Sequence, residues 1–180
     1  MASSSKAVIK YGRIAQFLHW GMTIPIILLL LFGEQTMGGH NVKFWPSVHA
    51  SAGFILMSLA VMRIFWRWFN PPPPLASRSR LEKLLAHATH LALYGAIVLI
   101  PLTGWLAYTE HVHRSLGMRQ ASLFGLRIPL LPDLGINWHF IHNWGGKLVL
   151  ALVVLHIAAT LKHHFYDRDT TIKRMLPWGQ

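Results

Sequence analysis

The stretch HNWGGKLVLALVVLHIAATLKHH, residues 142–164, decides how this chain folds. It is apolar over almost its whole length, yet histidines stand at both ends, and His156 lies fourteen residues after His142. A helix rises about 1.5 Å per residue, so this stretch is long enough to cross the ~30 Å hydrocarbon core of a membrane. We therefore predict a membrane-spanning helix that carries imidazoles at two depths.

The composition extends this prediction to the whole chain. Of its 180 residues, 53% are hydrophobic and only 13% are charged, whereas soluble domains have about 25% charged residues. Four apolar stretches are long enough to span a bilayer, at roughly residues 14–36, 47–69, 84–108 and 138–165. The expected fold is an all-α, integral membrane four-helix bundle that forms a single domain over residues 1–180.

Basic residues predict the orientation of this bundle. Twelve of the 17 Lys and Arg residues lie in the N-terminal tail, around the linker after the second stretch and in the C-terminal part, whereas four lie in the two opposite loops. Cytoplasmic loops carry an excess of Lys and Arg, so both termini are predicted to be cytoplasmic. The net charge of +11 is then mainly a topology signal, because the charges flank the spans and form no single patch for nucleic acid.

Two further segments shape the expected topology. The first span has a basic start but no small-residue cleavage site, so we expect it to be retained and not removed as a signal peptide. The run FNPPPPLASRSR, residues 69–80, predicts an extended cytoplasmic linker, since four prolines cannot continue a helix. The loop at roughly residues 109–137 contains GLRIPLLPDLGIN, which predicts no long helix there and a fold over the outer mouth of the bundle.

The chain has no cysteine. This excludes disulfides, thiolate metal sites and the C-x-x-C-H attachment of c-type haem. Any haem must therefore be held non-covalently.

The depth of the histidines is more informative than their number, which is twelve. Ionisable side chains inside a span are costly and usually mark a functional site, although an isolated histidine can also be a hydrogen-bonded structural group. Fourteen residues bring a helix back to within about 40° of the same face, ~21 Å further along its axis. His142 and His156 thus share one face at two depths. His19 is expected near the cytoplasmic end of the first span, and His49 near the outer end of the second.

These four histidines form two predicted layers, with His19 and His156 on the inside and His49 and His142 on the outside. Two neutral imidazoles from different helices are what six-coordinate haem iron requires in a bundle core. Zinc fits less well, because its ligands must lie within about 2.1 Å of one ion and the layers are ~20 Å apart. His139 is a neighbouring alternative to His142, but the fourteen-residue spacing favours His142.

Positively charged side chains near these layers are candidate partners of haem propionates. Arg63 lies fourteen residues after His49 and should point toward the inner layer. A snorkelling charge at the end of the span is the alternative interpretation. Lys147 has the same two interpretations at the outer layer.

Several longer motifs carry a resemblance to a known family. They are FLHW (residues 17–20), VHASAGFILMSLAVMRIFWR (48–67), LAHATHLALYGAIVLIPLTG (85–104), LHIAATLKHHFY (155–166) and RMLP (174–177), together with the Pro-rich linker. Over nearly the whole chain the sequence resembles the bacterial cytochrome b561 family, particularly its superoxide oxidase members. The resemblance implies two b-type haems with iron ligands at His19, His49, His142 and His156.

The resemblance also implies an activity and a location. Superoxide oxidases take electrons from periplasmic superoxide and reduce ubiquinone, so the expected protein is a multi-pass enzyme of the bacterial inner membrane that needs no obligatory protein partner. The implied quinone-site residues are His163 and a basic linker residue, either Arg78 or Arg80. His163 is expected to relay protons or simply to cap its helix.

Two histidines of the third span, His87 and His90, have no settled role in this scheme. They are expected to line the quinone pocket or to bond to propionates of the inner haem. As iron ligands they are second choices, because His19 and His156 already complete the inner layer.

Two other functions remain open from the sequence. One is a cytochrome b subunit that links the quinone pool to a separate redox partner. The other, from a different class, is a haem-free membrane transporter or scaffold whose histidines bind ions.

Overall fold

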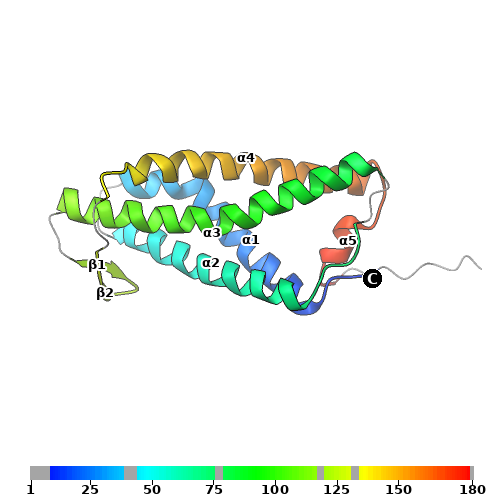
Figure 1. Cartoon of the computed structure of the whole chain (residues 1–180), viewed down its shortest axis with the longest axis horizontal. Coiled ribbons are helices and arrows are strands. Elements are labelled where there is room, and N and C mark those ends of the chain that lie inside the picture. The colour runs from blue at the N-terminus through cyan, green and yellow to red at the C-terminus, as the bar shows by residue number, and fades with distance from the viewer. Residues whose placement is uncertain (1–8, 39–43, 76–78, 117–119, 131–133, 179–180) are drawn as a thin grey trace, which may run out of the picture.

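Four long helices run along the molecule in the computed structural model shown in Figure 1. They are α1 (Arg13–Gly38), α2 (Phe44–Phe69), α3 (Arg80–Leu116) and α4 (Trp138–Phe165). The structure describes residues 9–38, 44–75, 79–116, 120–130 and 134–178. The predicted helical bundle is confirmed, and each long helix is apolar and long enough to cross a membrane. The single-domain organisation over residues 1–180 stays a prediction.

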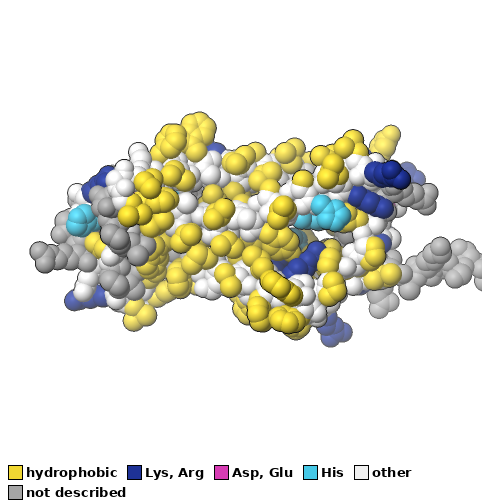
Figure 2. Space-filling view, in the orientation of Figure 1, with side chains coloured by type: hydrophobic (Ala, Val, Ile, Leu, Met, Phe, Trp, Pro, Cys, Tyr) yellow, Lys and Arg dark blue, Asp and Glu magenta, His cyan; other side chains and the backbone are white. Residues whose placement is uncertain are grey.

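Apolar side chains cover the outside of the bundle. Phe17, Trp68, Leu91 and Leu148 are 75%, 82%, 75% and 63% exposed. Figure 2 shows hydrophobic side chains over the middle of the visible face, with Lys and Arg side chains toward the two ends. An apolar surface this extensive is unfavourable in water and favourable in lipid.

One buried cluster joins α1 and α2 around a small residue. Ala60 of α2 is completely buried, together with Leu56 and with Met22 of α1. In membrane bundles such close approach supplies dispersion contacts that a larger side chain would prevent. α3 packs between α2 and α4, and α1 packs mainly on α2.

The third helix is longer than the sequence predicts. It covers Arg80–Leu116, whereas the expected span was 84–108. No proline or glycine follows Gly104 until Gly117, so nothing ends the helix earlier. About two further turns of helix therefore occupy the beginning of the expected loop at 109–137.

A small hairpin, which the sequence analysis did not predict, fills part of the same loop. β1 (Gln120–Leu123) pairs antiparallel with β2 (Leu126–Pro129). The two turn residues, Phe124 and Gly125, have φ values of 51° and 78°, as a two-residue hairpin turn of this hand requires. The backbone N–H of Phe124 donates to Ser51 Oγ at 3.1 Å, which ties the turn to α2. We call this end of the bundle the hairpin end.

The opposite end, here called the terminal end, holds the Pro-rich linker, the beginning of α1 and the short helix α5 (Thr171–Met175) (Figure 1). The side chain of Gln16 donates to the carbonyl oxygen of Arg174 at 3.2 Å. The indole N–H of Trp20 donates to the carbonyl oxygen of Met175 at 2.9 Å. Side chains of α1 thus satisfy carbonyl groups at the end of α5 and fasten the C-terminal segment to the bundle.

Candidate functional site

Two imidazoles face each other near the hairpin end. His49 comes from α2 and His142 from α4, and their ring centroids lie 6.0 Å apart with the ring planes at 90°. Both side chains are partly buried between the helices. The structure thus brings together the two histidines of the predicted outer layer, which we call the hairpin-end layer.

Glycines on the neighbouring helices make room for these rings. A Cβ atom at Gly104 of α3 would lie 2.7 Å from Cε1, 3.0 Å from Nδ1 and 3.3 Å from Nε2 of His142. A Cβ atom at Gly33 of α1 would lie 3.3 Å from Cε1 of His49. The absence of a side chain at these two positions lets the helix backbones lie directly against the imidazoles.

The nitrogens of this layer suit iron coordination. His142 Nδ1 lies 3.0 Å from the carbonyl oxygen of Ile100. If Nδ1 carries the proton and donates it there, the neutral ring keeps Nε2 as a free lone pair. Nδ1 of His49 is buried and has no hydrogen-bond partner among the described residues. Two half-buried neutral rings with nitrogens available, from two different helices, fit the axial positions of a haem iron.

Three imidazoles gather at a second level, which we call the terminal-end layer. The rings of His90 and His156 have centroids 5.7 Å apart and planes at 65°. His19 of α1 is close enough to both for electrostatic interaction. The structure therefore brings His90 of α3, a second-choice ligand in the sequence analysis, to the predicted inner pair, and the rings of His90 and His156 are in contact. The pairing of His19 with His156 stays a prediction.

The terminal-end layer is also electropositive. Arg63 of α2 is an electrostatic neighbour of all three imidazoles, and its Cζ atom lies 5.8 Å from the ring centroid of Tyr94. Arg67 is a further cationic neighbour of His90. Charged side chains at such depth need anionic partners, and the propionates of a haem in this layer would supply them. The two layers lie fourteen residues apart on α4, which corresponds to about 21 Å.

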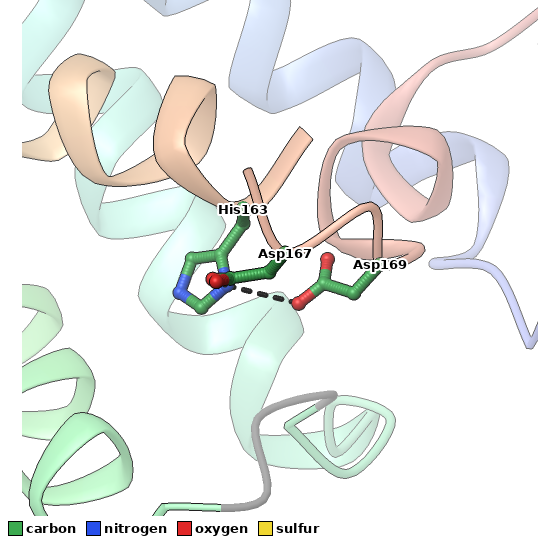
Figure 3. A group of neighbouring side chains, drawn as sticks. All are labelled: His163, Asp167 and Asp169. Atoms are coloured by element: carbon green, nitrogen blue, oxygen red, sulfur yellow. Dashed lines mark ion pairs between the residues drawn. The ribbon is translucent and has the colours of Figure 1, made fainter. Parts of the chain in front are cut away.

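Figure 3 shows a third cluster, at the terminal end of α4. His163 Nδ1 lies 2.9 Å from Asp167 Oδ2 and 2.9 Å from Asp169 Oδ2. These are ion-pair distances, but neither contact is aligned well enough to count as a hydrogen bond. Lys162 Nζ lies 2.9 Å from the same Asp167 oxygen and 2.6 Å from Glu82 Oε1 of α3. Three ligating atoms are close enough for a metal ion, but Lys162 already balances Asp167, so we interpret the cluster as an ion-pair network.

The pKa of Asp169 should make the α4–α5 turn sensitive to acid. Burial acts to raise this pKa, but the hydrogen bonds from Thr171 and the nearby His163 outweigh burial and hold the pKa below its usual value. A carboxylate with a lowered pKa in the folded state stabilises the fold above its unfolded pKa, near 4, and loses that contribution as the pH falls through the folded pKa.

We therefore expect amide protons of α5, corrected for intrinsic exchange, to lose protection below about pH 4. Hydrogen exchange with mass spectrometry measures this protection. The variant Asp169→Asn should show weaker protection at neutral pH and a smaller change on acidification. Equal acid sensitivity in the variant and the parent would contradict the assignment to Asp169.

The remaining predicted residues lie apart from the two layers or outside the described residues. Arg80 is exposed at the first turn of α3, and Arg78 lies outside the described residues. His87 is exposed, with Nδ1 2.7 Å from the carbonyl oxygen of Lys83. His139 is exposed as well, which supports the choice of His142 over it. Lys147 is exposed, and its Nζ lies 5.1 Å from the ring centroid of Trp144.

Several residues in these clusters were missed from the sequence, among them Asp167, Asp169 and Thr103. Asp167 could have been found, because helical spacing brings a carboxylate four residues after a histidine close to it, although α4 itself ends at Phe165. Asp169 lies only two residues further on. Thr103, whose Oγ1 lies 3.4 Å from His142 Nδ1, gave no signal, since it precedes that histidine by 39 residues and belongs to another helix.

Comparisons with known proteins point to one family. Residues 10–178 match the family model described as prokaryotic cytochrome b561. The chain is 36% identical to "Cytochrome b561 homolog 2" of Escherichia coli (strain K12), over 93% of this chain and 91% of that protein. It is 25% identical to "Probable superoxide oxidase CybB" of Yersinia pestis, over 93% of this chain and 96% of that protein. It is also 25% identical to "Cytochrome b561 homolog 1" of E. coli K12, over 93% and 97%.

Proposed function

The chain belongs to the prokaryotic cytochrome b561 family, and from this premise we propose that it oxidises superoxide at its hairpin end and reduces ubiquinone at its terminal end. As a family member it is a multi-pass membrane protein that binds haem b and transfers electrons. The proposed reaction converts two superoxide anions, one ubiquinone and two protons into two molecules of oxygen and one ubiquinol. Two electrons leave superoxide and two enter the quinone.

The observation that carries the proposal is the arrangement of imidazoles in two layers along α4. His49 and His142 would hold one haem, and His19 and His156 the other. Bound haem supplies a centre that accepts and releases one electron at a time. The two imidazole layers lie about 21 Å apart along α4, so two haems held there would together bridge most of the ~30 Å apolar core.

The terminal end has the polar groups that a quinone site needs. Ubiquinone takes up two protons as well as two electrons, and an imidazole is suited to deliver protons near neutral pH. His163 lies at this end, where Asp167 and Asp169 hold its Nδ1 side. We propose His163, with Arg80 or Arg78 from the linker, as the residues that contact the quinone head group. His87 is a further candidate for the lining of this pocket.

The same proposal sets the orientation. The terminal end would face the cytoplasm, because most basic residues flank the helices there. The hairpin end would face the periplasm, where superoxide would donate its electron without an obligatory protein partner. The bacterial inner membrane is the location that this arrangement implies.

A second candidate function is favoured by one finding. The relative that is 36% identical is named only as a cytochrome b561 homolog, whereas the probable superoxide oxidase is 25% identical. The chain could therefore serve as an electron-transfer subunit between the quinone pool and a separate redox protein. The third possibility from the sequence, a haem-free transporter or scaffold, has no support in the family membership.

Superoxide-driven quinone reduction in the purified, haem-loaded protein tests the proposal. The protein is placed in vesicles with ubiquinone, superoxide is generated enzymatically outside, and quinol formation is followed by absorbance. We expect quinol formation above the protein-free background, and its loss on addition of superoxide dismutase. Absence of this turnover in protein with full haem content would contradict superoxide oxidation and favour the subunit function.

A further inference from the structure

Three groups of α3 surround the imidazole of His142. The carbonyl oxygen of Ile100 lies 3.0 Å from Nδ1 of the ring. The hydroxyl of Thr103 donates to the same carbonyl oxygen at 2.8 Å and lies 3.4 Å from Nδ1. Gly104 has no side chain, and a Cβ atom at this position would clash with three atoms of the ring. One turn of α3 therefore determines where this imidazole lies and what its Nδ1 contacts.

The Ile100 carbonyl is shared between two side-chain donors. A hydrogen bond from Nδ1–H to a carbonyl or carboxylate fixes the tautomer of a metal-binding histidine and makes its other nitrogen a stronger electron donor. The Thr103 hydroxyl donates to the same carbonyl oxygen, so this oxygen is a weaker acceptor for the proton on Nδ1 of His142. Removing the hydroxyl should strengthen the hydrogen bond from His142 Nδ1 to this carbonyl. The other ring nitrogen would then donate more electron density to the iron, which favours the oxidised state.

The facing histidine has no such partner. Nδ1 of His49 is buried without a hydrogen bond among the described residues. The two imidazoles of the hairpin-end layer are therefore unequal, and a change at Thr103 acts on one of them only. Among the described residues no contact links Thr103 to the terminal-end layer, and the two layers lie about 21 Å apart along α4.

We propose that Thr103 is a positioning residue that sets the redox potential of the hairpin-end haem by sharing the Ile100 carbonyl with His142. This inference rests on the proposed role of His142 as an iron ligand. It names a residue that touches neither substrate nor iron and acts only through the ligand.

Redox titration of the purified, haem-loaded protein tests the inference. Thr103→Val has nearly the shape of the parent and lacks the hydroxyl, whereas Thr103→Ser keeps it. We expect the valine variant to keep both haems and to hold one of them oxidised more strongly, with about a threefold change in the ratio of oxidised to reduced haem at a fixed potential. For a one-electron couple at 59 mV per tenfold change, this is a shift of about 28 mV to lower potential. The serine variant should titrate like the parent.

Glycine variants of the same helix add a steric test. Gly104→Ala places a methyl group against the ring of His142 and should lower the haem content or broaden the haem spectrum. Gly95→Ala is the matched control, because a Cβ atom there meets nothing within 4 Å. Equal haem content and equal spectra in the two variants would contradict the close contact between α3 and His142.

Two results would overturn the role of Thr103. One is an unchanged potential in Thr103→Val with both haems present, and the other is an equal shift of both haems. The titration uses neither superoxide nor quinone, so a failure of the proposed reaction would leave this inference standing. Retention of both haems in His142→Ala would instead show that His142 is not an iron ligand, and the inference about Thr103 would then have no basis.

Discussion

Replacing His142 with alanine is expected to leave the protein with one haem in place of two. The change would remove one of the two proposed haem ligands of the hairpin-end layer, and His49 alone would hold the porphyrin too weakly to survive purification. The haem-to-protein ratio should fall from about two to about one, since each six-coordinate haem needs both its ligands. His49→Ala should give the same ratio, and superoxide-driven quinone reduction should be lost in both variants.

The control for this prediction lies on the same helix. His139 is exposed and lies three residues before His142, so His139→Ala removes an equal side chain from the same end of α4. We expect this variant to keep both haems and the parent spectrum. Loss of a haem in His139→Ala, with both retained in His142→Ala, would reassign the ligand.

The second large effect is expected at the terminal-end layer. His156→Ala and His19→Ala should each remove the other haem, and this result would identify His19 as the partner of His156. His90→Ala should keep both haems and change only the environment of the terminal-end haem. The reason is that His90 would lie beside the haem, at the propionate side near Arg63 and Arg67, and would not bind its iron. Haem content and reduced-minus-oxidised spectra measure these differences.

The ring contact between His90 and His156 makes this prediction a sharp one. His87→Ala is the control, because His87 lies about one turn before His90 and is exposed. If His90→Ala lost a haem and His19→Ala kept both, the iron would lie between His90 and His156. The layer would then have ligands from α3 and α4.

The bundle and its two histidine levels could be predicted because they depend on local periodicity. Apolar stretches of sufficient length predict spans whatever their neighbours are. The spacing of His142 and His156 follows from helix geometry alone. The ring contact of His90 with His156 could not be predicted in the same way, because it depends on the rotation of α3 about its own axis.

Other features depend on contacts between distant residues. The hairpin turn uses Phe124 with a positive φ, which a sequence pattern does not favour, and Ser51 of α2 stabilises it. The bond between His142 and Ile100 joins residues 42 positions apart. By contrast, the contact between His163 and Asp167 has the i, i+4 spacing and could have been predicted from the sequence.

A density map of the haem-loaded protein in a membrane-like environment tests the central claim most directly. It should contain two porphyrins, one with its iron between His49 and His142 and the other between His19 and His156, separated along α4 by about 21 Å. A map with a single porphyrin, or with both irons at the same level of the bundle, would contradict the account.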